Sequence, residues 1–442
     1  MNVCADAFVN SAITGVNGGL VVLAADDPSM HSSQNEQDSR FYGKFALVPI
    51  FEPSCQQEAY DMVARAFALS EEVKLPVLLR VVTRLAHSRA AVEVADEAAP
   101  QNTLNPASDR GWVLLPAIAR RQYTGLIDKQ DALRSYSESL AAIEYSSPSR
   151  AIAALGVVAC GIGYNYVKET GADVPILKIN HYPLPAAAIK ALSLRCRKIL
   201  VVEDGQPVVE QDIKAILGAD YKVEGRLTGA LPRTGELDPD NVAAALGKPS
   251  AEGEKASTLA NRPPQLCPGC GHRDVYTALN KVAAEYPGAR IFGDIGCYTL
   301  GALPPFNALA SCVDMGASIT MAKGAADAGV FPAIAIIGDS TFTHSGMTGL
   351  LDAVNDHSNI TVVISDNLTT AMTGGQDSAG TSKFEAICLG LGVEPEHLHV
   401  VVPIPANMEK ITEIIRSEIE YNGVSVIVPR RECMQTLKKH RK

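Results

Sequence analysis

The chain of 442 residues is 47% apolar and 20% charged, an ordinary composition for a folded protein of two or three domains. Its 49 acidic residues outnumber the 39 basic ones, and no basic stripe interleaved with aromatic residues occurs, so we expect no nucleic-acid partner. The apolar runs are shorter than the roughly 18 residues of a membrane span, and no signal peptide is visible at the N-terminus. We therefore expect a cytoplasmic protein with no membrane partner.

Residues 1–97 alternate short apolar runs with a helical pattern, which is typical of an α/β domain. The predicted strands lie at 20–23, 46–50 and 76–82, and the predicted amphipathic helix spans 52–73. Four polar residues close the third strand and could meet a substrate carboxylate: Arg80, Thr83, Arg84 and His87. The polar segment 31–38 is predicted to be a loop at a strand end, either solvated or at the edge of an active site.

The middle of the chain contains two predicted linkers around a second α/β unit. Residues 98–150 are polar and proline-containing before they turn helical, which indicates a linker with a helix. The α/β unit spans 151–247, where Gly161 and Gly163 match a dinucleotide-binding pattern only in part. Residues 248–265 form the second predicted linker.

The most informative stretch lies in the last segment, 266–442. Two continuously apolar runs, 334–337 and 360–364, predict buried strands, and apolar residues at helical spacing lie between them. The unit is therefore predicted to be βαβ. Because parallel strands end at the same edge of a sheet, Asp339 and Asn367 should meet there.

A carboxylate and an amide oxygen together suit Mg²⁺, which prefers oxygen ligands and keeps open positions for phosphate and water. A backbone carbonyl near Thr369 would be a further ligand, so the site predicts a bound diphosphate. The alternative is an ordinary βαβ unit with polar loops.

A stretch of small residues opens another predicted helix in this segment. It contains Gly316, Ala317, Ser318 and Lys323. Backbone amides at a helix N-terminus can bind a phosphate group by donating hydrogen bonds to its oxygens. A close helix packing contact explains the same small residues equally well.

Ten cysteines in a chain without a secretion signal indicate thiols or ligands rather than disulfides. Cys160, Cys196, Cys312 and Cys388 lie in apolar or mixed surroundings and are expected in the core. Cys267 and Cys270 form a single C-x-x-C, which alone is weak support for a zinc site.

Several motifs occur in a characteristic order: DDPSMHSSQNEQD at 26–38, CPGCGH at 267–272, GDIGC at 293–297, GDS at 338–340 and NLTTAMTGGQ at 367–376. Over essentially the whole chain they resemble the 2-oxoacid:ferredoxin oxidoreductases, and within these the large alpha subunits of the indolepyruvate enzymes. The GDS motif, 26 intervening residues and Asn367 look like the thiamine diphosphate motif, with Ser340 in place of its usual second glycine.

The resemblance implies a multi-domain α/β protein of the thiamine diphosphate-binding folds, with parallel sheets flanked by helices. Residues 1–97 would be a pyrimidine-binding-type domain, 151–247 a transketolase C-terminal-like domain and 266–442 the diphosphate-binding domain. The implied coenzyme-binding residues are Gly338, Asp339, Ser340, Asn367, Thr369, Gly296, Cys297 and Gly316. Asp339, Asn367 and Thr369 would hold Mg²⁺.

In related oxidoreductases, cysteines at positions like Cys267, Cys270, Cys297 and Cys433 hold a [4Fe–4S] cluster near the coenzyme, and four thiolates suit such a cluster. Free thiols that shape the coenzyme pocket are the alternative. The ferredoxin-like C-terminal domain of the indolepyruvate subunit, with its repeated C-x-x-C-x-x-C runs, is not found in this sequence.

The resemblance also leaves the activating carboxylate open. In the family a glutamate near the start of the pyrimidine domain supports proton removal from the coenzyme. Met1 falls where the family's chain is already well inside that domain. None of Glu36, Glu52 and Glu58 sits in the family's motif, so the catalytic residue is unknown and the expected glutamate is absent from this chain.

The implied reaction is oxidative decarboxylation of an aryl 2-oxoacid such as indolepyruvate, with coenzyme A taking the acyl group and ferredoxin the electrons. A smaller beta subunit is the implied partner. Two alternatives stay open: a non-redox thiamine diphosphate-dependent decarboxylase, which needs no cluster, and a non-catalytic remnant subunit that lacks the activating carboxylate.

Overall fold

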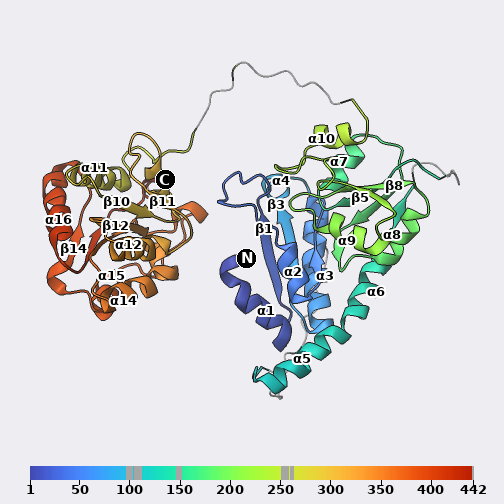
Figure 1. Ribbon diagram of the computed structural model, residues 1–442, viewed down its shortest axis with the longest axis horizontal. Coiled ribbons are helices and arrows are strands. Elements are labelled where there is room, and N and C mark those ends of the chain that lie inside the picture. Colours follow the sequence, from blue (N-terminus) through green and yellow to red (C-terminus); the bar gives the residue numbers. More distant parts are fainter. Residues whose placement is uncertain (96–102, 104–111, 146–151, 250–257, 259–262, 441–442) are drawn as a thin grey trace. The chain divides into compact units, whose positions relative to one another are not determined.

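A computed structural model describes residues 1–95, 103, 112–145, 152–249, 258 and 263–440. The chain divides into two compact units, residues 1–255 and 256–442 (Figure 1). Among the described helices, none has the length and apolar character needed to cross a membrane.

The first sheet of the N-terminal unit has the strand order β1 (Val21–Asp26), β3 (Val77–Val82), β2 (Ile50–Phe51) and β7 (His181–Tyr182). The first three strands are parallel, and β7 runs antiparallel to β2. Its helices are α1 (Ala5–Thr14), α2 (Arg40–Ala46), α3 (Gln56–Val73) and α4 (Thr83–His87). The predicted amphipathic helix is present as α3, which buries Met62, Ala66 and Leu69 against the sheet.

One predicted strand in this region is wrong. Residues 46–49 do not form a strand, because α2 continues to Ala46 and Leu47 then adopts a left-handed backbone with a φ of 58°. This turn leaves only Ile50 and Phe51 to pair with β3. The apolar run of five residues is therefore divided between the end of a helix, a turn and the start of a short strand.

The second sheet has the order β4 (Ile143–Glu144), β6 (Ile176–Ile179), β5 (Gly156–Cys160), β8 (Lys198–Val202) and β9 (Lys222–Glu224), parallel except for β4. Its helices are α7 (Gly163–Glu169), α8 (Ala186–Ser193), α9 (Val208–Leu217) and α10 (Pro239–Ala245). The described part of the first predicted linker contains α5 (Pro116–Asp128), α6 (Gln130–Leu140) and the edge strand β4.

The two glycines after β5 have packing reasons rather than a nucleotide-binding one. Gly161 has a φ of +47°, and a Cβ there would lie 2.8 Å from the side chain of Glu52. A Cβ on Gly163 would lie 2.9 Å from the carbonyl oxygen of Val202. Both positions therefore need glycine for close packing.

The C-terminal unit is one parallel sheet in the order β11 (Ser311–Cys312), β10 (Arg290–Gly293), β12 (Ala333–Gly338), β13 (Ile360–Ser365), β15 (Val424–Pro429) and β14 (Leu398–Val401). Helices cover both of its faces (Figure 1). One core includes residues of α12 (Ala317–Asp327), α14 (Met347–Asn355) and α15 (Phe384–Gly390), and the other includes residues of α11 (Gly271–Ala283) and α16 (Met408–Glu420).

Strands β12 and β13 are buried along their whole length. Alternate residues of β12 enter the two cores, Ile334 and Ile336 on one face and Ala335 and Ile337 on the other. This explains why the run is continuously apolar. The predicted βαβ unit and the predicted α/β class with parallel sheets flanked by helices are confirmed.

Candidate functional site

The carboxyl ends of β12 and β13 bring Asp339 and Asn367 together. Gly338 pairs in register with Ser365, and Asp339 follows the first of these strand ends directly, whereas Asn367 lies two residues after the second. The backbone amide of Thr369 lies 3.2 Å from Asp339 Oδ2 and 3.2 Å from Asn367 Oδ1. The two side-chain oxygens therefore converge on one point in the C-terminal unit.

Asp339 is a buried carboxyl, 3% exposed. Burial raises its pKa to about 6, and the nearby charge of Asp366 acts in the same direction. Hydrogen bonds from the Ser340 amide at 2.6 Å and the Ser340 hydroxyl at 3.2 Å lower the pKa in part. The ionised form of Asp339 is therefore destabilised in this position, and a bound cation would stabilise it.

The loop after β13 is held in shape by local contacts. Leu368 adopts a φ of +62°, unusual for a residue with a side chain, and its amide donates to Asp366 Oδ1 at 3.1 Å. Arg430 donates to Asp366 Oδ2 at 2.6 Å and to both oxygens of Glu385. Rigid support of this kind fixes where the oxygen of Asn367 points.

At the start of α12, where a phosphate was expected, the structure has the side chain of Asp294, which was not among the predicted site residues. Its Oδ2 accepts from the Gly316 amide at 3.0 Å, the Ser318 amide at 3.3 Å and the Ser318 hydroxyl at 2.7 Å. Tyr298 donates to its other oxygen. The amides at the start of α12 are thus already satisfied by a side chain, although the GDIGC motif contained the signal.

Gly296 and Gly316 both lie in close contacts. A Cβ on Gly316, whose φ is +94°, would lie 2.7 Å from the backbone oxygen of Ser345. A Cβ on Gly296 would overlap the ring of Tyr298. Their small size is therefore explained by packing beside Asp294.

The four predicted cysteine ligands line one cavity. Cys267, Cys270, Cys297 and Cys433 share it with Asp366 and Asn367. Burial, together with the charges of the other three thiols, raises the pKa of Cys297 to about 11. The Cys433 amide donates to the carbonyl oxygen of Asn367 at 3.1 Å, so the thiols adjoin the Asp339–Asn367 edge.

Within the described residues, no group of three or more histidine, cysteine or acidic side chains is arranged around a single metal-ion position. Of the other cysteines expected in the core, Cys160, Cys196 and Cys388 are buried, whereas Cys312 is only half-buried at the sheet-edge strand β11.

In the N-terminal unit, Arg80 is not available to a substrate, contrary to expectation. Its side chain is fully buried and donates to Asp26 at 2.6 Å, to the Asp204 carbonyl at 3.0 Å and to Glu52. Thr83 donates to Asp27, and Arg84, 47% exposed, pairs with Glu236. His87 is exposed at the end of α4.

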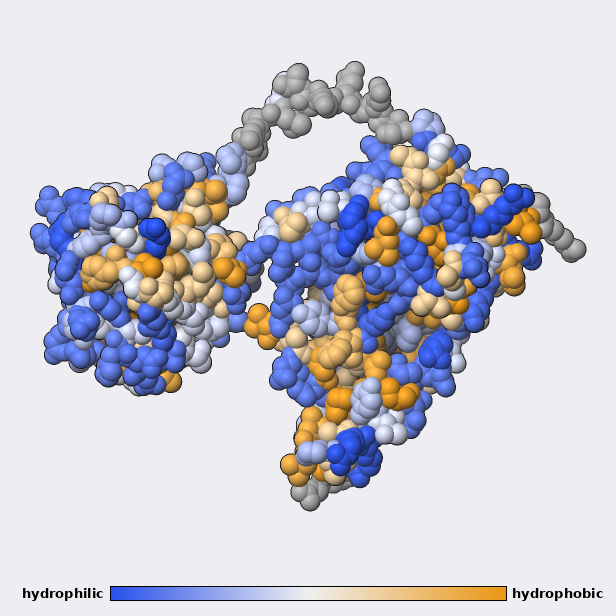
Figure 2. Space-filling model, viewed as in Figure 1, coloured by the Kyte–Doolittle hydropathy of each residue, from blue (hydrophilic) through white to orange (hydrophobic). Residues whose placement is uncertain are grey.

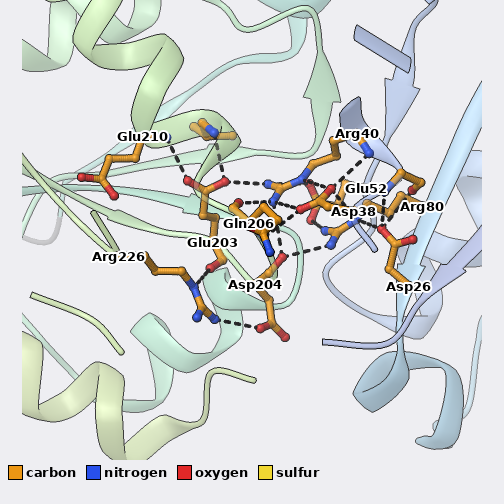
Figure 3. A network of polar contacts seen from close by, with 12 residues as sticks. Asp26, Asp38, Arg40, Glu52, Arg80, Glu203, Asp204, Gln206, Glu210 and Arg226 are labelled. Atoms are coloured by element: carbon orange, nitrogen blue, oxygen red, sulfur yellow. Dashed lines mark hydrogen bonds and ion pairs between the residues drawn. The ribbon is translucent and has the colours of Figure 1, made fainter. Parts of the chain in front are cut away.

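Arg80 belongs to a buried ionic network that joins the two sheets of the N-terminal unit (Figure 3). Arg40 donates to Asp38 and, at 2.8 Å, to Glu203 at the end of β8. Burial raises the pKa of Glu203 and of Asp204, so these carboxyls ionise less readily than in water. No sequence pattern marks this network, because Arg40 and Glu203 lie 163 residues apart in the chain.

The three glutamates considered for the activating role have different surroundings. Glu52 is buried and accepts hydrogen bonds from Arg80 and Tyr182. Glu58 accepts from the Ser54 amide at 2.9 Å and pairs with Lys178. Glu36 has a buried carboxyl oxygen with no hydrogen-bond partner. None of these contacts singles out a catalytic carboxylate.

Comparison with known proteins gives the family. Residues 294–428 match the family described as thiamine pyrophosphate enzyme, C-terminal TPP binding domain. The indolepyruvate oxidoreductase subunit IorA of Methanothermobacter thermautotrophicus is 38% identical over 466 residues, which cover 98% of this chain and 74% of that protein. The IorA subunit of Archaeoglobus fulgidus is 38% identical over 469 residues, which cover 98% of this chain and 73% of that protein. This chain belongs to the IorA family of indolepyruvate oxidoreductase subunits.

Membership of the IorA family confirms the resemblance found in the sequence and makes the chain a subunit of a thiamine diphosphate-dependent 2-oxoacid oxidoreductase. A solved structure of 2-oxoglutarate:ferredoxin oxidoreductase from Magnetococcus marinus is 18% identical, covers 41% of this chain and 70% of that chain, and has a TM-score of 0.32. A likeness of that size adds nothing to the assignment.

Proposed function

We propose that this IorA-family chain is the coenzyme-binding subunit of an enzyme that oxidatively decarboxylates an aryl 2-oxoacid such as indolepyruvate. Coenzyme A takes the acyl group, ferredoxin takes the electrons, and a smaller beta subunit completes the enzyme. The observation that carries the proposal is the convergence of Asp339 and Asn367 beside a cavity lined by four cysteines. The name of the IorA relatives supports the substrate class.

We propose that Mg²⁺ is held by the side chains of Asp339 and Asn367 and by the carbonyl of Thr369, with the diphosphate of the coenzyme as a further ligand. The residues fit this ion. A buried carboxylate whose pKa is raised by burial gains from a hard cation, and the amide oxygen beside it is of the same ligand class. Gly338 and Ser340 flank the carboxylate, and Ser340 Oγ lies 2.6 Å from Thr370 Oγ1.

When bound, thiamine diphosphate supplies the carbanion that adds to the 2-oxo carbon and the electron sink for loss of CO₂. The chain's own residues position it. Asp339 and Asn367 orient the diphosphate end, and the Asp366–Arg430–Glu385 contacts keep the loop of Asn367 rigid. Rigid support of a binding group lowers the cost of ordering it during the reaction.

We propose that Cys267, Cys270, Cys297 and Cys433 ligate a [4Fe–4S] cluster that accepts electrons from the coenzyme. The cavity that they share also contains Asn367, so the path from coenzyme to cluster would be short. Burial raises the pKa of Cys297 and Cys270, which keeps these thiols protonated at neutral pH. Cluster binding would therefore release protons, and its affinity would rise with pH.

The division into a pyrimidine-binding-type domain at 1–97, a transketolase C-terminal-like domain at 151–247 and a diphosphate-binding domain at 266–442 stays a prediction. Each segment contributes the main strands of a different sheet, which supports it. Strand β7, however, comes from the second segment and pairs with β2 of the first. The two N-terminal segments are therefore expected to fold together.

The test is anaerobic calorimetry of thiamine diphosphate with Mg²⁺ on the full chain, on Asp339→Ala and on the exposed control Asp352→Ala. We expect micromolar binding in the chain and the control and none in Asp339→Ala. Equal affinity in all three would refute the site. Absence of binding in every variant would favour a non-catalytic subunit.

Iron and sulfide analysis of the anaerobically purified chain tests the redox part separately. About four iron atoms per chain are expected for one cluster. Coenzyme binding without iron or sulfide would favour a non-redox decarboxylase and refute the proposed electron path.

A further inference from the structure

A cavity of about 350 Å³ lies in the N-terminal unit, where α2, α6, α8 and α9 meet. Its inner wall is apolar and includes Leu47, Val48, Ile50, Leu184, Val208 and Ile216. Protein interiors are close-packed and hold few voids larger than a water molecule. A space of this size with an apolar wall has the dimensions of a small-molecule site.

Arg40 lines the cavity with a guanidinium that is fully buried and already engaged, so this donor is not free for a ligand. It donates from Nε to Asp38 at 2.9 Å, from Nη1 to Glu203 at 2.8 Å and from Nη2 to the carbonyl of Gln206 at 2.8 Å. The inner part of a ligand must therefore be apolar, lying against aliphatic side chains and the face of the guanidinium.

The charged groups lie at the mouth. Lys44 and Asp212 form an ion pair there, with side chains 54% and 29% exposed. Arg134 also lines the cavity and pairs with Asp131, which is 89% exposed. Exposed ion pairs of this kind contribute little and exchange partners readily. Lys44 and Arg134 are about half exposed, 54% and 48%, so the carboxylate of a ligand can replace Asp212 and Asp131 as their partner.

We propose that this cavity binds a small carboxylic acid, whose ring-sized apolar body fills the cavity and whose carboxylate pairs with Lys44 and Arg134. The arrangement gives the ligand burial of its apolar surface together with charge-assisted hydrogen bonds at the rim. The site lies wholly in the N-terminal unit and does not depend on the function proposed for Asp339 and the cysteines.

The probe is 3-phenylpropanoate, which has a ring and a carboxylate but no 2-oxo group. Its binding to the full chain is measured by calorimetry, beside the neutral analogue 3-phenylpropan-1-ol. We expect saturable binding with a dissociation constant below about 1 mM and affinity at least tenfold weaker for the alcohol. Absence of saturable binding, or equal affinity for acid and alcohol, would overturn the proposal.

Variants locate the site. Arg134→Gln combined with Lys44→Gln should weaken binding at least tenfold, and Ala215→Trp, at the mouth, should abolish it, both with unchanged circular dichroism. Arg121→Gln, an exposed arginine on the neighbouring helix α5, is the matched control and should bind as the unmodified chain does. Binding must also survive Asp339→Ala. Loss in that variant, or full binding in the mouth variants, would place the probe elsewhere and refute the site.

Discussion

Asp339→Asn tests whether the carboxyl of Asp339 costs the chain stability in exchange for metal binding. In the folded chain, burial raises its pKa from 3.8 to about 6. Each pKa unit corresponds to about 1.4 kcal/mol, so ionised Asp339 destabilises the metal-free fold by about 3 kcal/mol above pH 6. Because the folded state binds this proton more tightly, the cost shrinks as the pH falls from 6 towards 3.8.

The neutral and nearly isosteric asparagine removes this cost. Metal-free Asp339→Asn should therefore be more stable than the unmodified chain by about 3 kcal/mol at pH 8, and by about 1 kcal/mol at pH 4.5. Urea unfolding of both chains at the two pH values, without metal, measures the difference. Asp352→Asn, an exposed carboxylate on α14, is the control and should change stability by less than about 0.5 kcal/mol.

A fall in pH should stabilise the metal-free chain but weaken coenzyme binding. Mg²⁺ needs the ionised carboxylate, so binding of thiamine diphosphate with Mg²⁺ should weaken about tenfold for each pH unit below 6, beyond any change seen in Asp339→Asn. The diphosphate itself titrates in this range, so the ratio of the two affinities is the informative quantity. A metal-free variant that is less stable than the unmodified chain at pH 8 would refute the reasoning, because the carboxylate would then be stabilising.

Three further predictions concern groups outside that carboxyl. Arg80→Met should lower the free energy of unfolding by about 3–5 kcal/mol, because it leaves buried carboxylates unpaired. The control Arg84→Met, at an exposed ion pair, should change it by about 0–1 kcal/mol. Equal effects of the two substitutions in urea unfolding would contradict the buried network. Asp294→Ala should lower the free energy of unfolding by about 2–3 kcal/mol, since the α12 amides and the Tyr298 hydroxyl lose their acceptor. Thermal unfolding measures this change, and an unchanged midpoint would show that water replaces the carboxylate. Cys433→Ser should lose iron while keeping thiamine diphosphate affinity within about threefold; retained iron would exclude Cys433 as a ligand.

Much of the C-terminal unit could be predicted because its signals are local. The apolar runs of β12 and β13 are continuous since both faces of each strand are buried, and the polar residues that follow them are only one βαβ unit apart. The elements of the N-terminal unit were harder to predict from the sequence. The run 46–50 is equally apolar, but a helix end and the left-handed Leu47 divide it, and no composition rule marks that division.

The sequence predicted which residues lie at the candidate site but not which groups they contact. The sequence placed the Gly316 and Ser318 amides at a helix start, where a phosphate or a carboxylate could equally bind, and the structure gives that place to Asp294. Arg80 was expected to face a substrate because it stands near a strand end. Instead it is buried, where it pairs with carboxylates next to the first sheet and donates to the Asp204 carbonyl oxygen next to the second.

The sequence by itself determined the α/β class, the family and the meeting of Asp339 with Asn367, because parallel strands joined by one helix must end at the same edge. Only the tertiary structure decided that Cys267 and Cys433, at opposite ends of the C-terminal unit in sequence, line one cavity with Asn367, and that Arg40 and Arg80 are buried between two sheets. The physical reason is that burial and charge pairing depend on neighbours distant in the chain, whereas strand order and turn position follow from nearby residues.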